Sequence, residues 1–260
     1  MKTQKKLWSA LAALCVATGT VAQPAYNYSK LQKEQLGRGV VAIRENPSDV
    51  VVSWRYLSSD PINTSFNVYR NGEKIAEVPH STGTFYRDTY SGNEKAVYTV
   101  KPVINGVETG KLNGNYTLPA NAPSGYIDIP LDRPAEGVTP SGQKYTYSPN
   151  DASIGDVDGD GEYEIILKWD PSNAHDNAHD GYTGNVYFDC YRLTGEKLWR
   201  IDLGHNVRAG AHYTQFMVFD LDGDGKAEVV MKTSDGTKDG KGKIIGCLLY
   251  TSPSPRDRSV

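Results

Sequence analysis

An acidic loop that occurs twice constrains the fold of this chain more than any other feature. Residues 156–164 read DVDGDGEYE, and residues 220–228, which begin 64 positions later, read DLDGDGKAE. Each copy leads directly into an apolar segment, at 165–167 and at 229–231. A repeat of this length with several short strands is typical of a β-propeller blade. The repeat therefore predicts an all-β fold built from similar sheets.

The spacing of the carboxylates indicates that each loop binds calcium. Acids at positions 1, 3, 5 and 9, with glycines at 4 and 6, can surround one ion with hard oxygen atoms. Without an ion these carboxylates would repel one another and partly protonate, so a merely solvated turn is disfavoured. The expected ligands are the side chains of Asp156, Asp158, Asp160 and Glu164 with the carbonyl of Glu162, and those of Asp220, Asp222, Asp224 and Glu228 with the carbonyl of Lys226. Since one loop supplies each set, we expect both Ca²⁺ ions to be structural.

Two regions of different composition follow one another. Residues 26–120 contain short apolar segments separated by turn dipeptides such as Asn71-Gly72, which predicts a β-sandwich. Trp54, the strand and turn at 66–72 and Tyr98 resemble a fibronectin type III module, which we expect to be a spacer. Residues 121–246 open with a proline-rich connection and become rich in Asp, Gly and aromatic residues. Four strands are expected per repeat, so this region predicts one complete propeller blade and the start of a second.

The two ends of the sequence differ from the rest of the chain, each in its own way. Residues 1–22 carry three lysines, an apolar run and small residues before Gln23, which is typical of a signal peptide and predicts a secreted or periplasmic protein. The apolar run is too short for a membrane anchor. Residues 247–260 break the pattern and are interpreted as a non-native read-through tail, so that the native chain would be truncated near 246.

Composition excludes several other classes of protein. A net charge of −3 over 260 residues does not favour nucleic-acid binding. Outside the signal peptide and the tail, Cys190 is the remaining cysteine, so no internal disulfide is expected. Cys190 lies in an alternating apolar segment and is interpreted as a small buried hydrophobe.

Three further segments could contact a ligand. Residues 145–151 combine aromatic and amide side chains that suit a sugar, although ordinary packing at a strand edge is an equal alternative. The long polar loop 170–184 contains His175 and His179, but its composition does not favour the helix that would align them on zinc. Residues 208–215 could present Arg208 and His212 to an acidic substrate, or these side chains could be satisfied internally.

Taken together, residues 145–151, 168–173, 180–184, 198–204, 208–216 and both acidic loops closely resemble polysaccharide lyase family 11, the rhamnogalacturonan lyases. The resemblance runs from about residue 36 to 246. It implies an eight-bladed propeller with several calcium ions that cleaves the rhamnose–galacturonate backbone of pectin by β-elimination. It also implies that Asn150 and Asp170 contact the sugar. Lys168, Arg208 and His212 are candidates only for neutralising the charge of the substrate, and the catalytic base stays unknown.

The sequence thus predicts an amino-terminal fragment of a secreted, calcium-dependent rhamnogalacturonan lyase, and predicts that the fragment is inactive by itself. The expected partner is the pectic polysaccharide, with no nucleic acid, no membrane after removal of the signal and no obligate protein partner. The alternatives are a non-catalytic, calcium-pinned propeller that binds carbohydrate or mediates adhesion, and a purely structural scaffold. Formation of an unsaturated product distinguishes the lyase from both.

Overall fold

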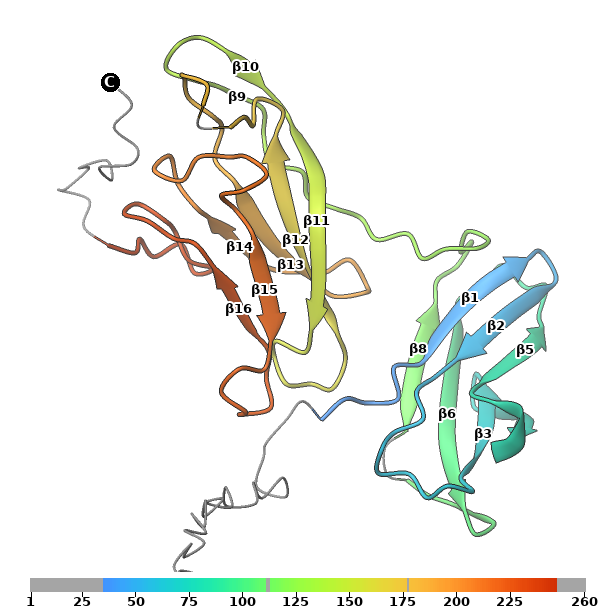
Figure 1. Cartoon of the computed structure of the whole chain (residues 1–260). Coiled ribbons are helices and arrows are strands. Elements are labelled where there is room, and N and C mark those ends of the chain that lie inside the picture. The colour runs from blue at the N-terminus through green and yellow to red at the C-terminus, as the bar shows by residue number, and fades with distance from the viewer. Residues whose placement is uncertain (1–34, 111–112, 177, 247–260) are drawn as a thin grey trace, which may run out of the picture. The chain divides into compact units, whose positions relative to one another are not determined.

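The computed structural model describes residues 35–110, 113–176 and 178–246, and these residues form β-structure almost throughout (Figure 1). Among them the helical element is a single 3-10 turn, η2 (His80–Thr82). In this part of the chain, no helix has the length and apolar character needed to cross a membrane. The predicted all-β class is confirmed. The predicted signal peptide and the predicted read-through tail both lie outside the described residues.

Two antiparallel sheets form the first folded region. One contains β1 (Val41–Asn46), β2 (Asp49–Ser53) and β5 (Phe85–Thr89). The other contains β4 (Glu73–Val78), β3 (Ser65–Arg70), β6 (Ala96–Ile104) and β7 (Val107–Glu108), with β8 (Gly114–Leu118) also paired to β6. The turn from β3 to β4 has positive φ at Asn71 and Gly72, 51° and 85°, as expected for Asn-Gly in a tight hairpin.

One hydrophobic core joins these two sheets. Val50 and Val52 of β2 are fully buried, as are Val68 of β3 and Tyr98 and Val100 of β6. They belong to a single cluster of packed side chains. Alternate residues of each strand point into this cluster, because side chains of a strand alternate between its two faces. The region is therefore two sheets packed face to face, which we call the sandwich. Its likeness to a fibronectin type III module stays a prediction.

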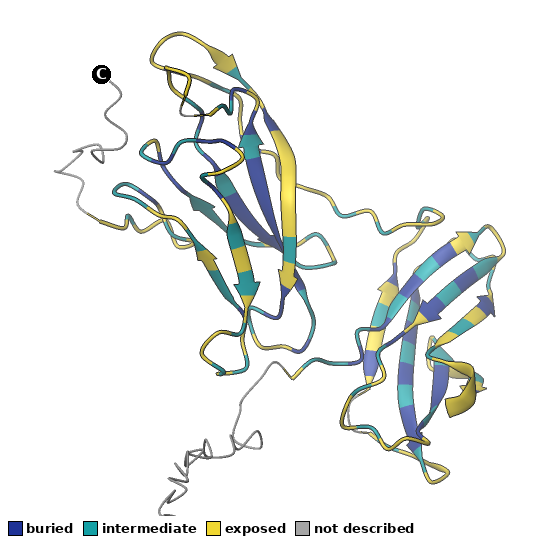
Figure 2. Cartoon of the chain, viewed as in Figure 1, coloured by how far each residue is buried: buried dark blue, intermediate teal, exposed yellow. Residues whose placement is uncertain are grey.

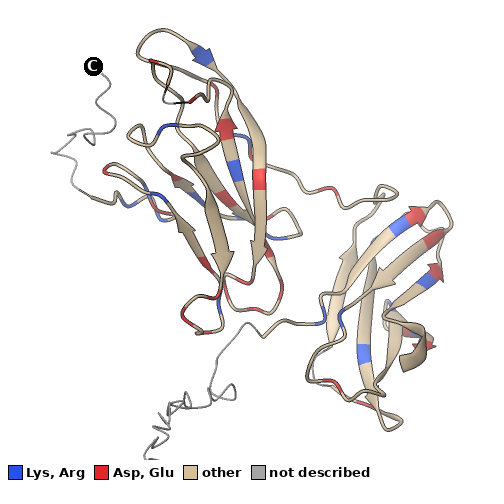
Figure 3. Ribbon diagram, viewed as in Figure 1, with Lys and Arg blue, Asp and Glu red and all other residues tan. Residues whose placement is uncertain are grey.

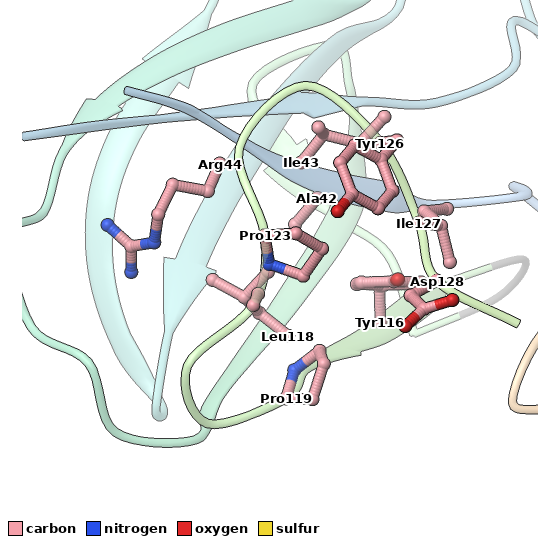
Figure 4. Close-up of a pocket in the computed structure, with 11 residues that line it drawn as sticks. Ala42, Ile43, Arg44, Tyr116, Leu118, Pro119, Pro123, Tyr126, Ile127 and Asp128 are labelled. Atoms are coloured by element: carbon pink, nitrogen blue, oxygen red, sulfur yellow. The ribbon is translucent and has the colours of Figure 1, made fainter. Parts of the chain in front are cut away.

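The chain leaving the sandwich packs against its edge. Pro123 and Tyr126 cover Ala42 of β1 and Leu118 of β8, around a hollow of about 50 Å³ (Figure 4). Ligand pockets for small molecules are typically about 300 Å³ or larger. The hollow has room for water molecules but not for a sugar ring. Further along, β9 (Gly137–Val138) pairs with β10 (Lys144–Tyr145).

The second folded region begins with a four-stranded antiparallel sheet. Its strands β11 (Tyr147–Gly155), β12 (Glu164–Pro171), β13 (Tyr187–Tyr191) and β14 (Lys197–Asp202) lie side by side in chain order. β12 is buried along most of its length, whereas β11 is exposed between its ends (Figure 2). The four strands expected around the first acidic loop are thus present as an antiparallel meander, and its identity as a propeller blade stays a prediction.

A second, two-stranded sheet packs against the first. It contains β15 (Phe216–Phe219) and β16 (Glu228–Met231). The ring of Phe216 meets that of Phe188 at a centroid distance of 4.8 Å within a shared apolar cluster. Cys190 is fully buried in the same cluster, and burial raises the pKa of its thiol to about 12, as expected of a buried hydrophobe. Within the described residues no sheet closes on itself, so a complete propeller stays a proposal.

Candidate functional site

The first acidic loop connects β11 to β12 and is organised by its first carboxylate. Asp156 Oδ1 accepts a hydrogen bond from the backbone N–H of Gly159 at 2.7 Å, and Oδ2 accepts one from Gly161 at 2.9 Å. These glycines have φ of 80° and 92°, in the left-handed region that other residues rarely adopt. At the far end Glu164 Oε2 accepts from the N–H of Val157 at 3.0 Å. Backbone donors thus turn both carboxylates inward.

The second acidic loop, between β15 and β16, repeats these contacts. Asp220 accepts hydrogen bonds from the N–H groups of Gly223 and Gly225 at 2.8 and 3.1 Å. Glu228 accepts one from Leu221 at 2.8 Å. Because each bond has its counterpart 64 residues earlier, the repeat in the sequence is a repeat in conformation.

Each loop brings three of its four predicted side-chain ligands together. One oxygen from each member of a group lies within 4.8 Å of the others, for Asp156, Asp158 and Glu164 and for Asp220, Asp222 and Glu228. Asp160 and Asp224 lie outside these groups and accept hydrogen bonds from the N–H groups of Glu162 and Lys226, both at 2.9 Å. The structure thus assembles most of each predicted set, and Asp160 and Asp224 stay predictions as metal ligands.

The electrostatics of the first loop favour a cation. Asp156 and Glu164 each have an exposed fraction of 1%. Burial raises the pKa of Glu164 to about 7, and the nearby Asp158 and Asp160 add to this effect. Burial also raises the pKa of Glu162. Hard carboxylate oxygens that converge on one point are the donors that calcium prefers, so the donor set fits this ion.

The two acidic loops lie next to each other. The backbone N–H of Ala227 in the second loop donates to the carbonyl oxygen of Asp156 in the first at 2.8 Å. The acidic residues after β11 and after β15 gather at the same end of their sheets (Figure 3). One backbone hydrogen bond therefore joins the two loops directly.

Sequence reasoning missed Arg192, which follows β13. Its guanidinium pairs with Asp158 and with Asp160, the latter at 2.5 Å. The pairing of Ile165 with Tyr191 in the β12–β13 ladder explains this position, because Arg192 then comes opposite Glu164, where the loop enters β12. Pairing the strand after the acidic loop antiparallel with the next strand would have placed Arg192 beside the loop and so revealed it.

The predicted sugar contacts lie on β11 and β12. The ladder between these strands shifts register between Pro149 and Ala152, which leaves Asn150 and Asp151 as a bulge. Asn150 is exposed. Bulges redirect side chains out of the regular ladder, so Asn150 is available to a ligand.

Asp170 and Lys168 occupy one face of β12, because they are two residues apart in a strand. Asp170 is half-buried, its Oδ1 has no hydrogen-bond partner among the described residues, and burial raises its pKa. Lys168 is buried, with an exposed fraction of 2%, and its Nζ lies 2.7 Å from Oδ2 of Asp151 in the bulge. A buried acceptor without a partner costs free energy, so Asp170 is suited to accept a hydrogen bond from a hydroxyl group of a ligand.

Arg208, one of the other two predicted charge-neutralising residues, has different hydrogen-bond partners from Lys168. Arg208 donates to the carbonyl oxygens of His179 and Gly181 at 2.9 and 3.1 Å and so holds the loop 170–184. His212 is exposed. His175 and His179 have ring centroids 6.4 Å apart and belong to no converging ligand group among the described residues.

Comparison with protein families gives two matches along the chain. Residues 126–249 match the model of the C-terminal domain of rhamnogalacturonan lyase family 11, and residues 31–115 match that of the β-sheet domain of rhamnogalacturonan I lyases. The chain belongs to the family 11 rhamnogalacturonan lyases. The resemblance drawn from the acidic loops and the β11–β12 segments is therefore confirmed.

Particular relatives sharpen this assignment. Rhamnogalacturonan endolyase YesW of Bacillus subtilis is 51% identical over 95% of the chain, and exolyase YesX of the same bacterium is 54% identical over 84%. The chain spans 39% and 34% of their lengths. The crystal structure of YesW matches with a TM-score of 0.76, and that of a Bacillus licheniformis rhamnogalacturonan lyase with 0.75; each match covers 88% of the chain and 38% of the solved one.

Proposed function

We propose that the protein carrying this chain is a secreted or periplasmic rhamnogalacturonan lyase that acts on the pectic backbone. The observation that carries the proposal is the identity of 51% and 54% to proteins named as an endolyase and an exolyase. Export is supported by the lysines, apolar run and small residues at 1–22.

The proposed reaction is β-elimination at galacturonate. A base removes the proton at C5, the bond from C4 to the glycosidic oxygen breaks, and a double bond forms between C4 and C5. In this chain Asn150 and Asp170 would bind sugar hydroxyls at the β11–β12 face. Lys168 lies on the same face, where its positive charge favours an anionic substrate. None of the described residues is assigned as the base.

The proposal includes calcium in both acidic loops. Asp156, Asp158 and Glu164 would hold one ion, and Asp220, Asp222 and Glu228 the other. When bound, calcium supplies positive charge that offsets the repulsion among these carboxylates and fixes the loops. The support is the convergence of three oxygens within 4.8 Å in each loop.

Absorbance of the unsaturated product tests the lyase proposal. The full-length protein is incubated with rhamnogalacturonan, and new ultraviolet absorbance is expected. Asp170→Asn and Asn150→Ala should raise the KM about tenfold, since each removes a hydrogen bond to the sugar at a buried or bulged position. Lys74→Gln, an exposed change in β4, is the matched control. Binding without absorbance would contradict the lyase and support the non-catalytic, carbohydrate-binding alternative.

We also propose that the 260-residue chain alone is inactive. The support is that it spans only 39% and 34% of the lengths of YesW and YesX, and that β11 presents an exposed strand. The same absorbance assay on the chain by itself is expected to show no product. Turnover at the rate of the full-length protein would overturn this proposal without affecting the lyase assignment.

A further inference from the structure

A cation that belongs to the chain itself already lies against the first acidic loop. One terminal nitrogen of Arg192 contacts Asp158 and the other contacts Asp160 at 2.5 Å. Its Nε lies 3.4 Å from Glu196. Asp158 belongs to the converging group of the first loop, and Asp160 is a predicted ligand of the same ion. The guanidinium and a calcium ion would therefore draw on the same carboxylates.

The turn that carries Arg192 does not depend on its side chain, which adds to it only the exposed pair with Glu196. The connection from β13 to β14 is closed by backbone bonds, from Arg192 N–H to the carbonyl of Glu196 and from Gly195 N–H to the carbonyl of Arg192, both at 2.9 Å. Replacing the side chain leaves these bonds in place. A substitution of Arg192 therefore removes its contacts with the acidic loop and an exposed pair with Glu196, while the turn keeps its backbone bonds.

The charge of Arg192 acts in opposite directions on the empty and on the filled loop. Without metal, the guanidinium offsets the repulsion among the loop carboxylates and stabilises the folded loop. With calcium present, a positive charge within about 5 Å of a divalent ion costs about 1–2 kcal/mol even at the dielectric constant of water. Calcium must also compete with the guanidinium for Asp158.

We propose that Arg192 is a built-in counter-cation that lowers the calcium affinity of the first acidic loop and keeps that loop folded when it holds no ion. This inference rests on the proposed function, in which the loop binds calcium. It assigns to a residue outside the DxDGDG motif the control of how tightly the motif holds its metal.

Calorimetric titration with calcium chloride tests the inference on the full chain. In Arg192→Gln, the first loop is expected to bind calcium about tenfold more tightly, which corresponds to the repulsion removed. The melting temperature in a chelator is expected to fall, so the shift produced by calcium becomes larger. Arg192→Lys keeps the charge and should stay near the affinity of the unchanged chain.

Two further variants make the result specific. Lys197→Gln is the matched control, because Lys197 follows the same turn and is 31% exposed against 32% for Arg192, but pairs with Asp132 instead of an acidic loop. It should leave the calcium affinity unchanged. Asp222→Asn, added to both the unchanged chain and Arg192→Gln, disables the second loop, so that the remaining site is assigned to the first.

The outcomes separate the inference from the function on which it rests. Tighter binding in Arg192→Gln with Lys197→Gln unchanged supports the counter-cation. Equal or weaker binding in Arg192→Gln, with the second loop still taking up calcium normally, overturns it while leaving the calcium sites intact. No calcium uptake by the unchanged chain overturns both the counter-cation and the proposed calcium sites.

Discussion

Glu108 in the sandwich and Glu164 in the first acidic loop show how differently two regions treat a carboxylate. Hydrogen bonds from Tyr69, Asn67 and Lys101 lower the pKa of Glu108 to about 2. Burial raises the pKa of Glu164 to about 7. The sandwich satisfies its charge with its own donors, whereas the loop concentrates negative charge that its donors do not balance. The sandwich thus stabilises its carboxylate without an added ion, whereas the acidic loop has excess negative charge that a bound cation would offset.

The two acidic loops share one sequence motif but differ in burial and in the charges around them. They share three internal hydrogen bonds, to the first acid from the fourth and sixth residues and to the last acid from the second, yet Asp156 is buried and Asp220 is only half-buried. The first loop also faces Arg192, while among the described residues no basic side chain pairs with a carboxylate of the second. The motif determines the turn, and the surrounding strands determine the charge around it.

The largest expected effect is the loss of Asp156. Its carboxylate accepts three backbone hydrogen bonds, from Gly159, Asp160 and Gly161, against two for Asp220. Asp156→Ala should lower the free energy of unfolding of this region by about 3 kcal/mol, and Asp220→Ala by about 1 kcal/mol because its site is more exposed. Urea denaturation in a chelator, followed by hydrogen exchange in β11 and β12 for the first variant and in β15 and β16 for the second, measures both. Equal losses would remove the contrast between the loops.

Calcium should stabilise the acidic loops and leave the sandwich unchanged. At a hundredfold excess over its dissociation constant, a bound ion adds about 2.7 kcal/mol to the stability of the state that binds it. Hydrogen exchange with calcium or with chelator is expected to slow at 156–164 and 220–228. Peptides from β1 to β8 should exchange at the same rate under both conditions. Protection that appears equally in the sandwich would contradict the separation of the two regions.

Local patterns predicted the parts of the fold that depend on near neighbours. Alternation of apolar residues revealed the strands around Val50 and Val68, because alternate side chains enter one core. It does not indicate the full length of β6, which continues through Pro102 to Ile104. It also did not reveal β8, where Asn115 and Thr117 alternate with few apolar residues. Such strands are defined by their partners more than by their own sequence.

In the candidate site, too, contacts between near neighbours were predictable and contacts between distant residues were not. The acidic loops were predictable because the hydrogen bonds within each loop join residues at most seven apart. The contact of Arg192 with Asp158 spans 34 residues, and that of Lys168 with Asp151 depends on a bulge. For Arg208 the sequence left open a contact with the substrate or internal contacts, and its side chain donates to two carbonyl oxygens of the loop 170–184. Long-range register decides these positions, and a single sequence carries little information about it.

The smallest expected effect concerns Glu108 and acid. Its pKa falls from 4.5 in the unfolded chain to about 2 in the folded one, so the folded form holds its negative charge more strongly. This stabilisation is fully present above about pH 4.5 and is lost as the pH falls through 2. Glu108 is 30% exposed, so solvent screening limits the contribution to about 1 kcal/mol.

Urea denaturation of the unchanged chain and of Glu108→Gln between pH 5 and pH 2 measures this effect. The difference in the free energy of unfolding should be about 1 kcal/mol at pH 5 and should vanish near pH 2. Glu77→Gln controls for the loss of one negative charge, because Glu77 forms an exposed pair with Lys74 in the same sandwich. A difference that stays constant down to pH 2 would mean that Tyr69 and Asn67 act on Glu108 through packing instead of charge, and that the sandwich does not stabilise this carboxylate as an anion.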